Sequence, residues 1–240
     1  MLLKGKPVAS RKSNSVKSVA KSFLIMEELD KSGELSIGEL SERLGMDKAT
    51  VHRLINTVKD GGYVNQNPYS KKYSNSLKFL AMGNRVIEKI GVRQVARPYM
   101  VELSDKTGET INLGIRVNSK IIYIDRLESR SNIKVDLGIG VSVPSYCTGT
   151  GKAILAFTPN DELSELLDSI TFEKYTAQTI TDRDLFLREL EKIRRNGFAV
   201  DDGEYVDGLM CFAAPIFDFH GNPIAAISIS CPKYRYETDQ

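Results

Sequence analysis

The sequence predicts an α+β protein in which an N-terminal winged helix-turn-helix precedes a C-terminal domain built on an antiparallel sheet. Residues 35–73 carry two short amphipathic helices, a glycine turn and a basic hairpin, in that order. After residue 109, few strand-like runs are followed at once by a helix and another strand, which favours an antiparallel-rich sheet over a doubly wound one. Charge is also segregated, since residues 1–90 hold 16 Lys and Arg against 9 Asp and Glu, whereas residues 91–240 hold 17 against 22.

The composition bounds the class of protein. A chain of 240 residues with 41% hydrophobic and 27% charged residues is ordinary for a soluble globular protein. No apolar run approaches the roughly 20 residues that span a bilayer, and the first residues lack the apolar core of a signal peptide. The three cysteines show no CxxC spacing, so neither a disulfide framework nor a zinc site is expected. We therefore expect a cytoplasmic protein with no membrane contact and no cofactor.

The first helix is expected to begin near Ser15. Residues 1–14 precede it as a flexible basic arm, because they are rich in Lys, Arg, Ser and Gly without periodicity. Within the helix, apolar residues recur at spacings of three and four, which predicts one buried stripe. The stripe consists of Val16, Val19, Phe23, Met26 and Leu29. Residues 15–75 are assigned to one winged helix-turn-helix domain.

Two further helices follow in this domain, and each has a clear start signal. Ser36 followed by Glu39 forms a capping box at the start of the second helix, and Gly45 is the expected turn residue after it. Asp47 is a good N-cap for the third helix. The apolar residues of the third helix fall on one face, which we expect to pack inward; they are Val51, Leu54, Ile55 and Val58.

A hairpin and a linker helix complete the N-terminal half. Strand-like residues 63–66 and 72–74 flank the turn signal at 67–70, so this hairpin is the expected wing. Residues 76–92 then form a linker that is helical from 76 to about 90 and is broken at Gly91.

Residues 93–240 are expected to form the second domain. Strands are predicted at 110–117, 120–127, 132–137, 211–217 and 224–230. Helices are predicted at 94–106, 148–157, 160–168 and 182–195. Thr181 is the expected N-cap of the last helix, which closes at Asn196-Gly197.

The third helix of the first domain carries polar side chains suited to DNA. The major groove admits a helix, and long polar side chains on its exposed face read base edges. The candidates are Lys48, Thr50, His52, Arg53 and Asn56 on this helix, with Lys71 and Lys72 in the wing. Arg53 is equally suited to a phosphate, and His52 is as easily a surface histidine without a base contact. The alternative for the whole module is a three-helix unit that uses its basic face for protein contacts.

Four stretches of sequence together resemble the isocitrate lyase regulator (IclR) family of bacterial transcription factors. They are residues 50–54, 141–156, 201–216 and 225–230, which occur in the family's order. The resemblance runs from about Val16 to Pro232. It implies a GAF-like effector domain after the linker helix, with the antiparallel sheet flanked by helices. It also implies a homodimer or homotetramer on double-stranded operator DNA, regulated by a small carboxylate, sugar acid or aromatic acid.

The resemblance also implies the residues of an effector pocket. By motif these are Gly149, Thr150, Asp201, Cys211, Ser228 and Ser230, with apolar walls from Val135, Leu137, Ile139 and Leu209. Gly149 and Thr150 would lie at the start of a helix, where free backbone N–H groups suit a carboxylate. Two features depart from the family's pattern. Many relatives have histidine where this chain has Tyr146, and family members commonly continue with a helix after the last strand.

Other classes of function are less well supported by the sequence. Residues 149–152 invite a phosphate-loop interpretation, but Tyr146 and Ala153 stand where a P-loop needs Gly and Ser or Thr. Only two histidines exist, which disfavours an enzyme with a histidine-activated nucleophile. A regulator that senses thiol chemistry or metal through Cys147 and Cys211 stays open as the alternative. The sequence thus predicts a ligand-responsive DNA-binding regulator, a repressor rather than an activator, and not an enzyme.

Overall fold

The computed structural model describes residues 16–130 and 138–238. The predicted basic arm at 1–14 and the predicted strand at 132–137 therefore lie outside the described residues. The chain divides into two compact units between Val86 and Ile87, and each unit is described by itself.

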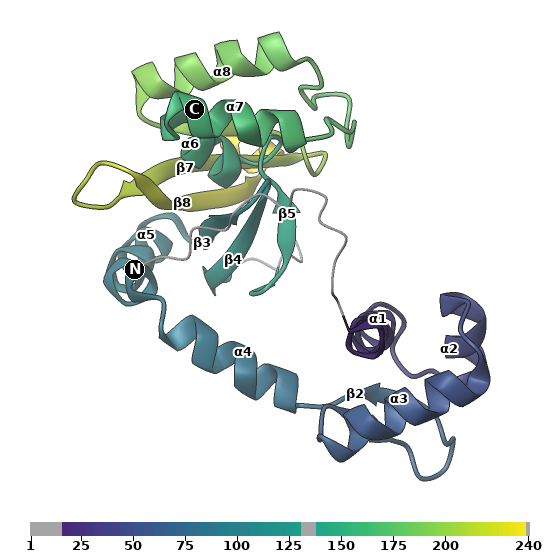
Figure 1. Cartoon of the computed structure of the whole chain (residues 1–240). Coiled ribbons are helices and arrows are strands. Elements are labelled where there is room, and N and C mark those ends of the chain that lie inside the picture. Colours follow the sequence, from purple (N-terminus) through teal and green to yellow (C-terminus); the bar gives the residue numbers. More distant parts are fainter. Residues whose placement is uncertain (1–15, 131–137, 239–240) are drawn as a thin grey trace. The chain divides into compact units, whose positions relative to one another are not determined.

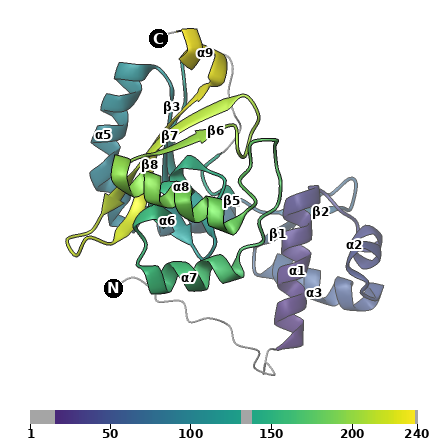
Figure 2. The same cartoon turned by 90° about the horizontal axis from the view of Figure 1, so that it is seen from above.

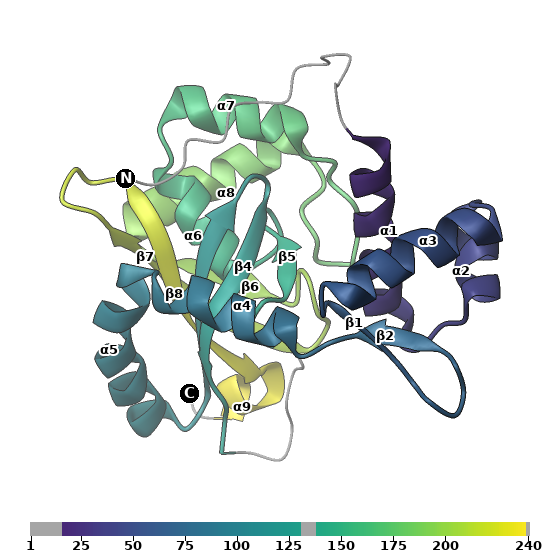
Figure 3. The same cartoon turned by 60° about the horizontal axis from the view of Figure 1, so that its bottom comes forward.

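Three helices and a short hairpin, followed by most of a fourth helix, α4 (Lys78–Glu88), make up the described part of the first unit (Figure 3). The helices are α1 (Lys17–Ser32), α2 (Ile37–Leu44) and α3 (Lys48–Asp60), and the hairpin strands are β1 (Val64–Gln66) and β2 (Tyr73–Asn75). The strands pair in antiparallel fashion, and Leu35 adds an isolated bridge to Tyr73. The core between these elements is built largely from α1, α2 and α3 side chains, and it includes the four α3 residues predicted to pack inward.

The predicted starts of α2 and α3 are confirmed, and α1 begins at Lys17. The Ser36 hydroxyl accepts a hydrogen bond from the Glu39 backbone at 3.2 Å, and the Glu39 carboxylate accepts one from the Ser36 backbone at 2.7 Å. Gly45 takes the left-handed conformation with φ 61°. The Asp47 side chain accepts from the Thr50 backbone N–H at 2.8 Å. Local capping thus fixes both ends of the turn that places α3.

The predicted buried stripe of α1 is wrong in its first half. Val16, Val19 and Phe23 are all at least half exposed, whereas the fully buried residues of the helix are Ile25 and Leu29. The core of this unit reaches only the second half of α1. The apolar stripe continues into the first half, where no other described element of the unit packs against it. Three large apolar side chains are consequently left on the outside.

A six-stranded antiparallel sheet forms the centre of the second unit (Figure 1). Its order is β5-β4-β3-β8-β7-β6, with β3 (Thr110–Val117), β4 (Lys120–Leu127), β5 (Ser142–Pro144), β6 (Ala199–Asp202), β7 (Leu209–Phe217) and β8 (Pro223–Pro232). Every neighbouring pair in this order is antiparallel. The predicted antiparallel α+β class is therefore confirmed.

Helices cover both faces of this sheet (Figure 2). On one face, α5 (Gly91–Thr107) packs through Ala96 and Met100 against alternate residues of the central strands. On the other face lie α6 (Gly149–Phe157), α7 (Asn160–Ser169) and α8 (Arg183–Asn196), which share the larger core. The layer between α6 and the sheet contains the residues predicted to bind an effector, as detailed below.

Several predicted boundaries in the second unit need correction. The N-cap of α8 is Asp182, whose side chain accepts from the Leu185 backbone at 2.8 Å, and not Thr181. α5 begins three residues earlier than expected, at Gly91, after a linker helix α4 (Lys78–Glu88). The sequence did not predict strands β5 and β6 or the short helix α9 (Lys233–Thr238). These elements are short, and their apolar residues show no extended alternation.

Candidate functional site

Helix α3 presents a polar face opposite its buried one. Val51, Leu54, Ile55 and Val58 are buried, so the remaining positions of the helix point away from the core. The polar residues predicted to meet DNA all lie on this remaining surface: Lys48, His52 and Arg53 are exposed, and Thr50 and Asn56 are half-buried. A helix of 13 residues held by its apolar face on a small core is the arrangement that enters a major groove.

Two neighbours on this face contact each other. The Asn56 amide nitrogen lies 3.3 Å from His52 Nε2, one helical turn away. The Arg53 side chain makes no hydrogen bond within the described residues, although its carbonyl accepts one from the Thr57 hydroxyl at 3.0 Å. Arg53 is therefore available for an external partner without breaking an internal bond.

The two lysines of the wing differ in their surroundings. Lys71 is exposed and has a left-handed backbone with φ 59°. Lys72 donates to Glu39 Oε1 at 3.0 Å, which joins the wing to the capping box of α2. The backbone hydrogen bond from Ser36, followed by the contact with Lys72, lowers the pKa of Glu39 to about 2. Lys72 thus starts as part of an internal ion pair, whereas Lys71 is free to meet a phosphate.

In the second unit, strand register places most of the predicted effector residues on one face of the sheet. Asp201 of β6 pairs with Cys211 of β7, and Cys211 pairs with Ser230 of β8. Ser228 precedes Ser230 by two positions, so its side chain points to the same face. This face is the one covered by α6, whose first residue Gly149 lies against Cys211.

Asp201 is the most deeply buried acid in this layer and already has partners. Its carboxylate accepts the Glu204 backbone N–H at 2.8 Å and also the Gly149 backbone N–H at the start of α6. Burial raises the pKa of Asp201 to about 6, although these hydrogen bonds oppose the rise. The helix N-terminus predicted to bind a ligand carboxylate therefore holds the chain's own carboxylate.

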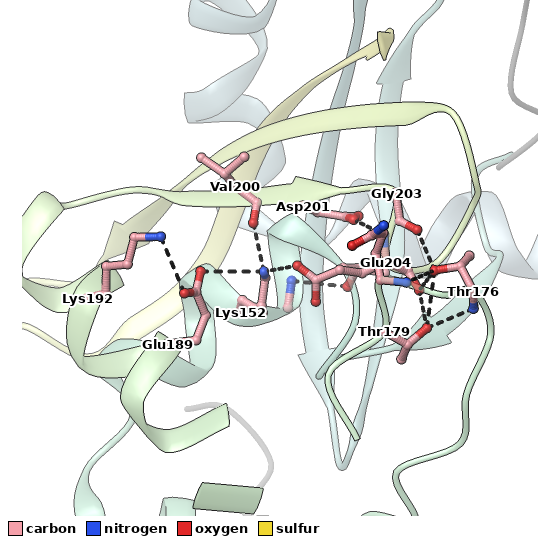
Figure 4. A network of polar contacts seen from close by, with 12 residues as sticks. Lys152, Thr176, Thr179, Glu189, Lys192, Val200, Asp201, Gly203 and Glu204 are labelled. Atoms are coloured by element: carbon pink, nitrogen blue, oxygen red, sulfur yellow. Dashed lines mark hydrogen bonds and ion pairs between the residues drawn. The ribbon is translucent and has the colours of Figure 1, made fainter. Parts of the chain in front are cut away.

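A buried ion pair next to Asp201 connects α6 with its neighbours (Figure 4). The Lys152 ammonium contacts the Glu204 carboxylate, donates to the Val200 carbonyl at 2.7 Å and lies 3.7 Å from Glu189 of α8. Burial raises the pKa of Glu204 to about 7, although the Lys152 charge opposes the rise. One buried cation thus connects α6 with β6 and with α8.

The loop between α7 and α8 is also held by hydrogen bonds to the residues beside this ion pair. The Thr176 hydroxyl donates to the Gly203 carbonyl at 2.6 Å, and the Thr179 hydroxyl donates to the Glu204 carbonyl at 2.7 Å (Figure 4). Tyr146 adds a third tie, because its hydroxyl donates to the Glu173 carbonyl at 2.7 Å. Tyr146 therefore holds this loop in place.

Two polar residues of this layer were missed at the sequence level. Asn112 of β3 pairs in register with Ser228, and its amide nitrogen lies 3.4 Å from the Ser228 hydroxyl and 3.2 Å from the Ser230 hydroxyl. Tyr123 of β4 pairs with Gly114 and is 4% exposed. The available signal for Asn112 was a lone amide between the apolar residues Ile111 and Leu113 of a predicted strand.

The expected apolar walls are placed only in part. Val135 and Leu137 lie outside the described residues, and Ile139 is about half exposed. Leu209 is buried on β7, two positions from Cys211 and hence on the same face of the sheet.

The three cysteines are free and buried. Burial raises the pKa of both Cys147 and Cys211, and the nearby Asp201 carboxylate raises them further. A thiol held in its neutral form is a poor nucleophile and a poor metal ligand. Within the described ranges, no cluster of three or more His, Cys, Asp or Glu side chains is placed to hold a metal ion. These observations do not favour the thiol- or metal-sensing alternative.

Among the residues that the structure describes, no helix is both long and apolar enough to cross a membrane.

Two family descriptions match the sequence. Residues 18–68 match the IclR helix-turn-helix domain, and residues 84–240 match the domain described as bacterial transcriptional regulator IclR C-terminal. The second match alone covers more than half of the chain.

Characterised relatives align over nearly the whole chain. The HTH-type transcriptional regulator KdgR of Escherichia coli K12 is 37% identical over 230 residues, which cover 96% of this chain and 88% of KdgR. The HTH-type transcriptional repressor AllR of the same strain is 31% identical over 235 residues, which cover 98% of this chain and 86% of AllR.

Solved structures have the same fold. The crystal structure of Thermotoga maritima IclR is 32% identical with a TM-score of 0.74, and the match covers 94% of each chain. An IclR homolog from Microbacterium hydrocarbonoxydans, solved in complex with 4-hydroxybenzoate, is 20% identical with a TM-score of 0.77. That match covers 90% of this chain and 89% of the homolog, and it concerns the fold alone.

Proposed function

Because this chain belongs to the IclR family of bacterial transcriptional regulators, we propose that it binds an operator as a homodimer or homotetramer and that a small organic acid controls this binding. The family consists of DNA-binding regulators and not of enzymes. The oligomer, the class of effector and the residues that bind each partner are the proposed parts.

The exposed face of α3 carries the DNA-binding proposal. Arg53 is assigned to a base edge or a phosphate, and Thr50 and Asn56 flank it on the same face. His52 and Lys48 border this face, and Lys71 of the wing is assigned to the sugar-phosphate backbone. Lys72 joins them on DNA only by leaving Glu39, so its contribution to affinity is expected to be smaller.

The polar layer between α6 and the sheet supports the effector proposal. Hydroxyls of Thr150, Ser228 and Ser230 and the thiol of Cys211 lie around the start of α6, where backbone N–H groups favour an anion. Asp201 occupies one of these N–H groups, so an incoming carboxylate competes with it or meets its protonated form. That a homolog of the same fold was solved with 4-hydroxybenzoate is consistent with an acid as effector.

Exposed apolar side chains support self-association. The first half of α1 exposes Val16, Val19 and Phe23, and the start of the linker exposes Leu77 and α4 exposes Leu80 and Val86. No residue of α4 is buried within the described chain, although the helix is amphipathic. Such surfaces mark contacts with another molecule, and a second copy is the partner that a two-fold operator requires.

Two further parts of the proposal follow from the class of protein. Repression is the proposed direction of control, supported by the likeness to AllR, which is named a repressor. A bacterial regulator that binds chromosomal DNA works in the cytoplasm, which is the location we propose.

A fluorescence anisotropy titration tests the DNA-binding part. The probe is a labelled fragment from the promoter of the protein's own gene, and the reference is a shuffled fragment of the same length and composition, both at about 150 mM salt. Specific binding typically exceeds non-specific binding by about 10³-fold or more. Equal affinity for the two fragments would contradict the proposal.

A further inference from the structure

Asn112 is a buried side chain that the fold leaves incompletely satisfied. The residue is 2% exposed, and its amide nitrogen faces the Ser228 and Ser230 hydroxyls. Its Oδ1 atom is buried and has no hydrogen-bond partner among the described residues. Leaving a buried amide oxygen unpaired lowers the stability of the fold, and most such groups in folded proteins are paired. A residue kept here at that cost is explained if another molecule supplies the missing partner.

A second unpaired oxygen lies in the same layer. The Thr150 hydroxyl is buried on α6 without a hydrogen bond of good geometry to the described residues, although the Tyr123 hydroxyl is close to it. Thr150 sits over Gly114, because a Cβ on that glycine would lie 2.8 Å from the Thr150 methyl group. Gly114 follows Asn112 by two positions on β3, so both unpaired oxygens lie between the same strand and α6.

The chemistry of Asn112 restricts what its partner is. The unpaired Oδ1 only accepts hydrogen bonds, so a carboxylate, a ketone or a hydrocarbon cannot satisfy it. Turning the amide over exchanges oxygen and nitrogen and leaves an unpaired donor instead, which a carboxylate or a ketone satisfies. A hydroxyl group both donates and accepts, so it satisfies Asn112 in either orientation, and it also pairs with the Thr150 hydroxyl.

We propose that Asn112 is a specificity residue that reads a hydroxyl of the effector, and that the effector is therefore a hydroxylated carboxylic acid. The proposal rests on the proposed function, which supplies the acid, and it adds the hydroxyl and the residue that recognises it. The Asn112 amide bridges Ser228 and Ser230, so one side chain orders two hydroxyls and offers a third contact of its own.

Matched acids and two variants test the proposal. The probes are gluconate and hexanoate, six-carbon monocarboxylates with and without hydroxyl groups, and glycerate and propanoate as a three-carbon pair. Wild-type protein, Asn112→Val and Thr110→Val are titrated with each acid, with binding followed by calorimetry and by the unfolding temperature. Thr110 is the matched control, because it lies on the same strand and face and its hydroxyl already accepts from the Ser129 backbone at 3.2 Å.

The two acids of a pair are expected to differ in their affinity for the protein. At least one hydroxylated acid binds wild-type protein at least tenfold more tightly than its unsubstituted counterpart. Asn112→Val weakens that binding at least tenfold, whereas Thr110→Val leaves it within about threefold. If the unfolding temperature of unliganded Asn112→Val shows that the variant does not fold, Asn112→Ser takes its place, with the same loss expected because the shorter side chain does not reach.

Three outcomes would overturn the proposal. They are equal binding of hydroxylated and unsubstituted acids, unchanged binding in both Asn112 variants, and no response of wild-type protein to any hydroxylated probe. Operator binding in the absence of acid distinguishes failure of this inference from failure of the proposed function. A protein that binds its operator and responds only to unsubstituted acids retains the proposed function and loses the role of Asn112.

Discussion

Arg53 and Arg43 show why exposure alone does not identify a DNA contact. Both are exposed arginines of the helix-turn-helix unit. Arg43 of α2 is bonded to Glu28 at 3.0 Å and to the Ser32 hydroxyl at 2.6 Å, so its guanidinium serves the fold. Arg53 of α3 is without such partners among the described residues and faces outward between two other polar residues.

Replacing these arginines one at a time should separate their roles. Arg53→Ala is expected to weaken binding to the promoter fragment by about 1–3 kcal/mol, because a bidentate base contact or a phosphate contact is lost. Arg43→Ala, the matched control, should change the affinity much less. Anisotropy titration at fixed salt measures both, and an Arg53 variant with the affinity of the control would exclude a role for Arg53 on DNA.

Asp201 makes a pH-dependent contribution to stability. Burial raises its pKa from the usual value of about 4 to about 6, so the folded chain binds a proton more tightly than the unfolded chain. This contribution is fully present below about pH 4 and is lost as the pH rises to about 6. Glu204 acts in the same direction up to about pH 7.

Asp201→Asn should flatten this dependence. The asparagine keeps an oxygen for the Glu204 backbone N–H but binds no proton, so the decline in stability between pH 4 and pH 6 becomes smaller. The expected change in slope is roughly 1 kcal/mol per pH unit. Urea unfolding at several pH values measures the slope, with the exposed Asp207→Asn as control. A slope equal to that of wild-type protein would show that Asp201 does not titrate in this range.

At the scale of elements, the sequence predicted what is set locally. Ser36 with Glu39 and Asp47 with Thr50 are neighbours in the chain, so their caps were predictable. Asn112 contacts residues more than 110 positions away, and only strand register places them together. The residues predicted to bind an effector came from a resemblance and not from periodicity, and the structure brings them onto one face of the sheet and the adjoining start of α6.

The strands that the sequence did not predict form by pairing with distant strands and are too short to have a pattern of their own. β5 and β6 are edge strands of three and four residues, too short to show alternation. The first half of α1 has the pattern of a buried helix but no core to cover it. Edge pairing and association between chains are decided by tertiary and quaternary structure, which a pattern within one element does not contain.

Replacing two helical glycines by alanine is expected to change the stability of the protein in opposite directions. A Cβ on Gly151 of α6 would lie 2.0 Å from the Ser145 carbonyl oxygen, whereas a Cβ on Gly83 of α4 meets nothing within 4 Å. Gly151→Ala is expected to destabilise the protein by about 2 kcal/mol or more, because backbone must shift. Gly83→Ala should stabilise α4 by about 0.5–1 kcal/mol. Chemical unfolding measures both, and a neutral Gly151→Ala would refute the tight approach of α6 to residue 145.

Two hydrogen bonds connect the start of α4 with the residues that follow α3. The Lys78 ammonium donates to the Gly61 carbonyl at 2.6 Å, and the Ser76 hydroxyl donates to the Gly62 carbonyl at 2.6 Å. The start of α4 is therefore bonded to the end of α3. A change in the direction of the linker helix consequently changes the direction of the recognition helix, which is the route we propose for control by an effector.

At the scale of the whole molecule, the exposed apolar surfaces of α1 and α4 predict self-association. Light scattering after size-exclusion chromatography is expected to give the mass of two or four chains. Leu80→Asp with Val86→Asp should lower this mass by placing charge in the interface, whereas Phe219→Asp, at an exposed position of the β7–β8 turn, should not. A wild-type protein that elutes with the mass of one chain at micromolar concentration would contradict the proposed oligomer.

The segregation of charge and the two compact units point to one division of labour. We propose that the basic unit binds DNA and that the polar layer beneath α6 in the acidic unit binds the effector. The coupling between the two sites is measured as the ratio of operator affinities without and with effector. Such ratios are commonly about 5–150.

The most direct test is therefore the affinity for the promoter fragment with and without the organic acid that most raises the unfolding temperature in a screen of small acids. The predicted result is an affinity at least fivefold weaker at saturating acid, and no such change in a Ser228→Ala, Ser230→Ala double variant. An operator affinity that is the same at zero and at saturating acid would contradict a ligand-responsive regulator.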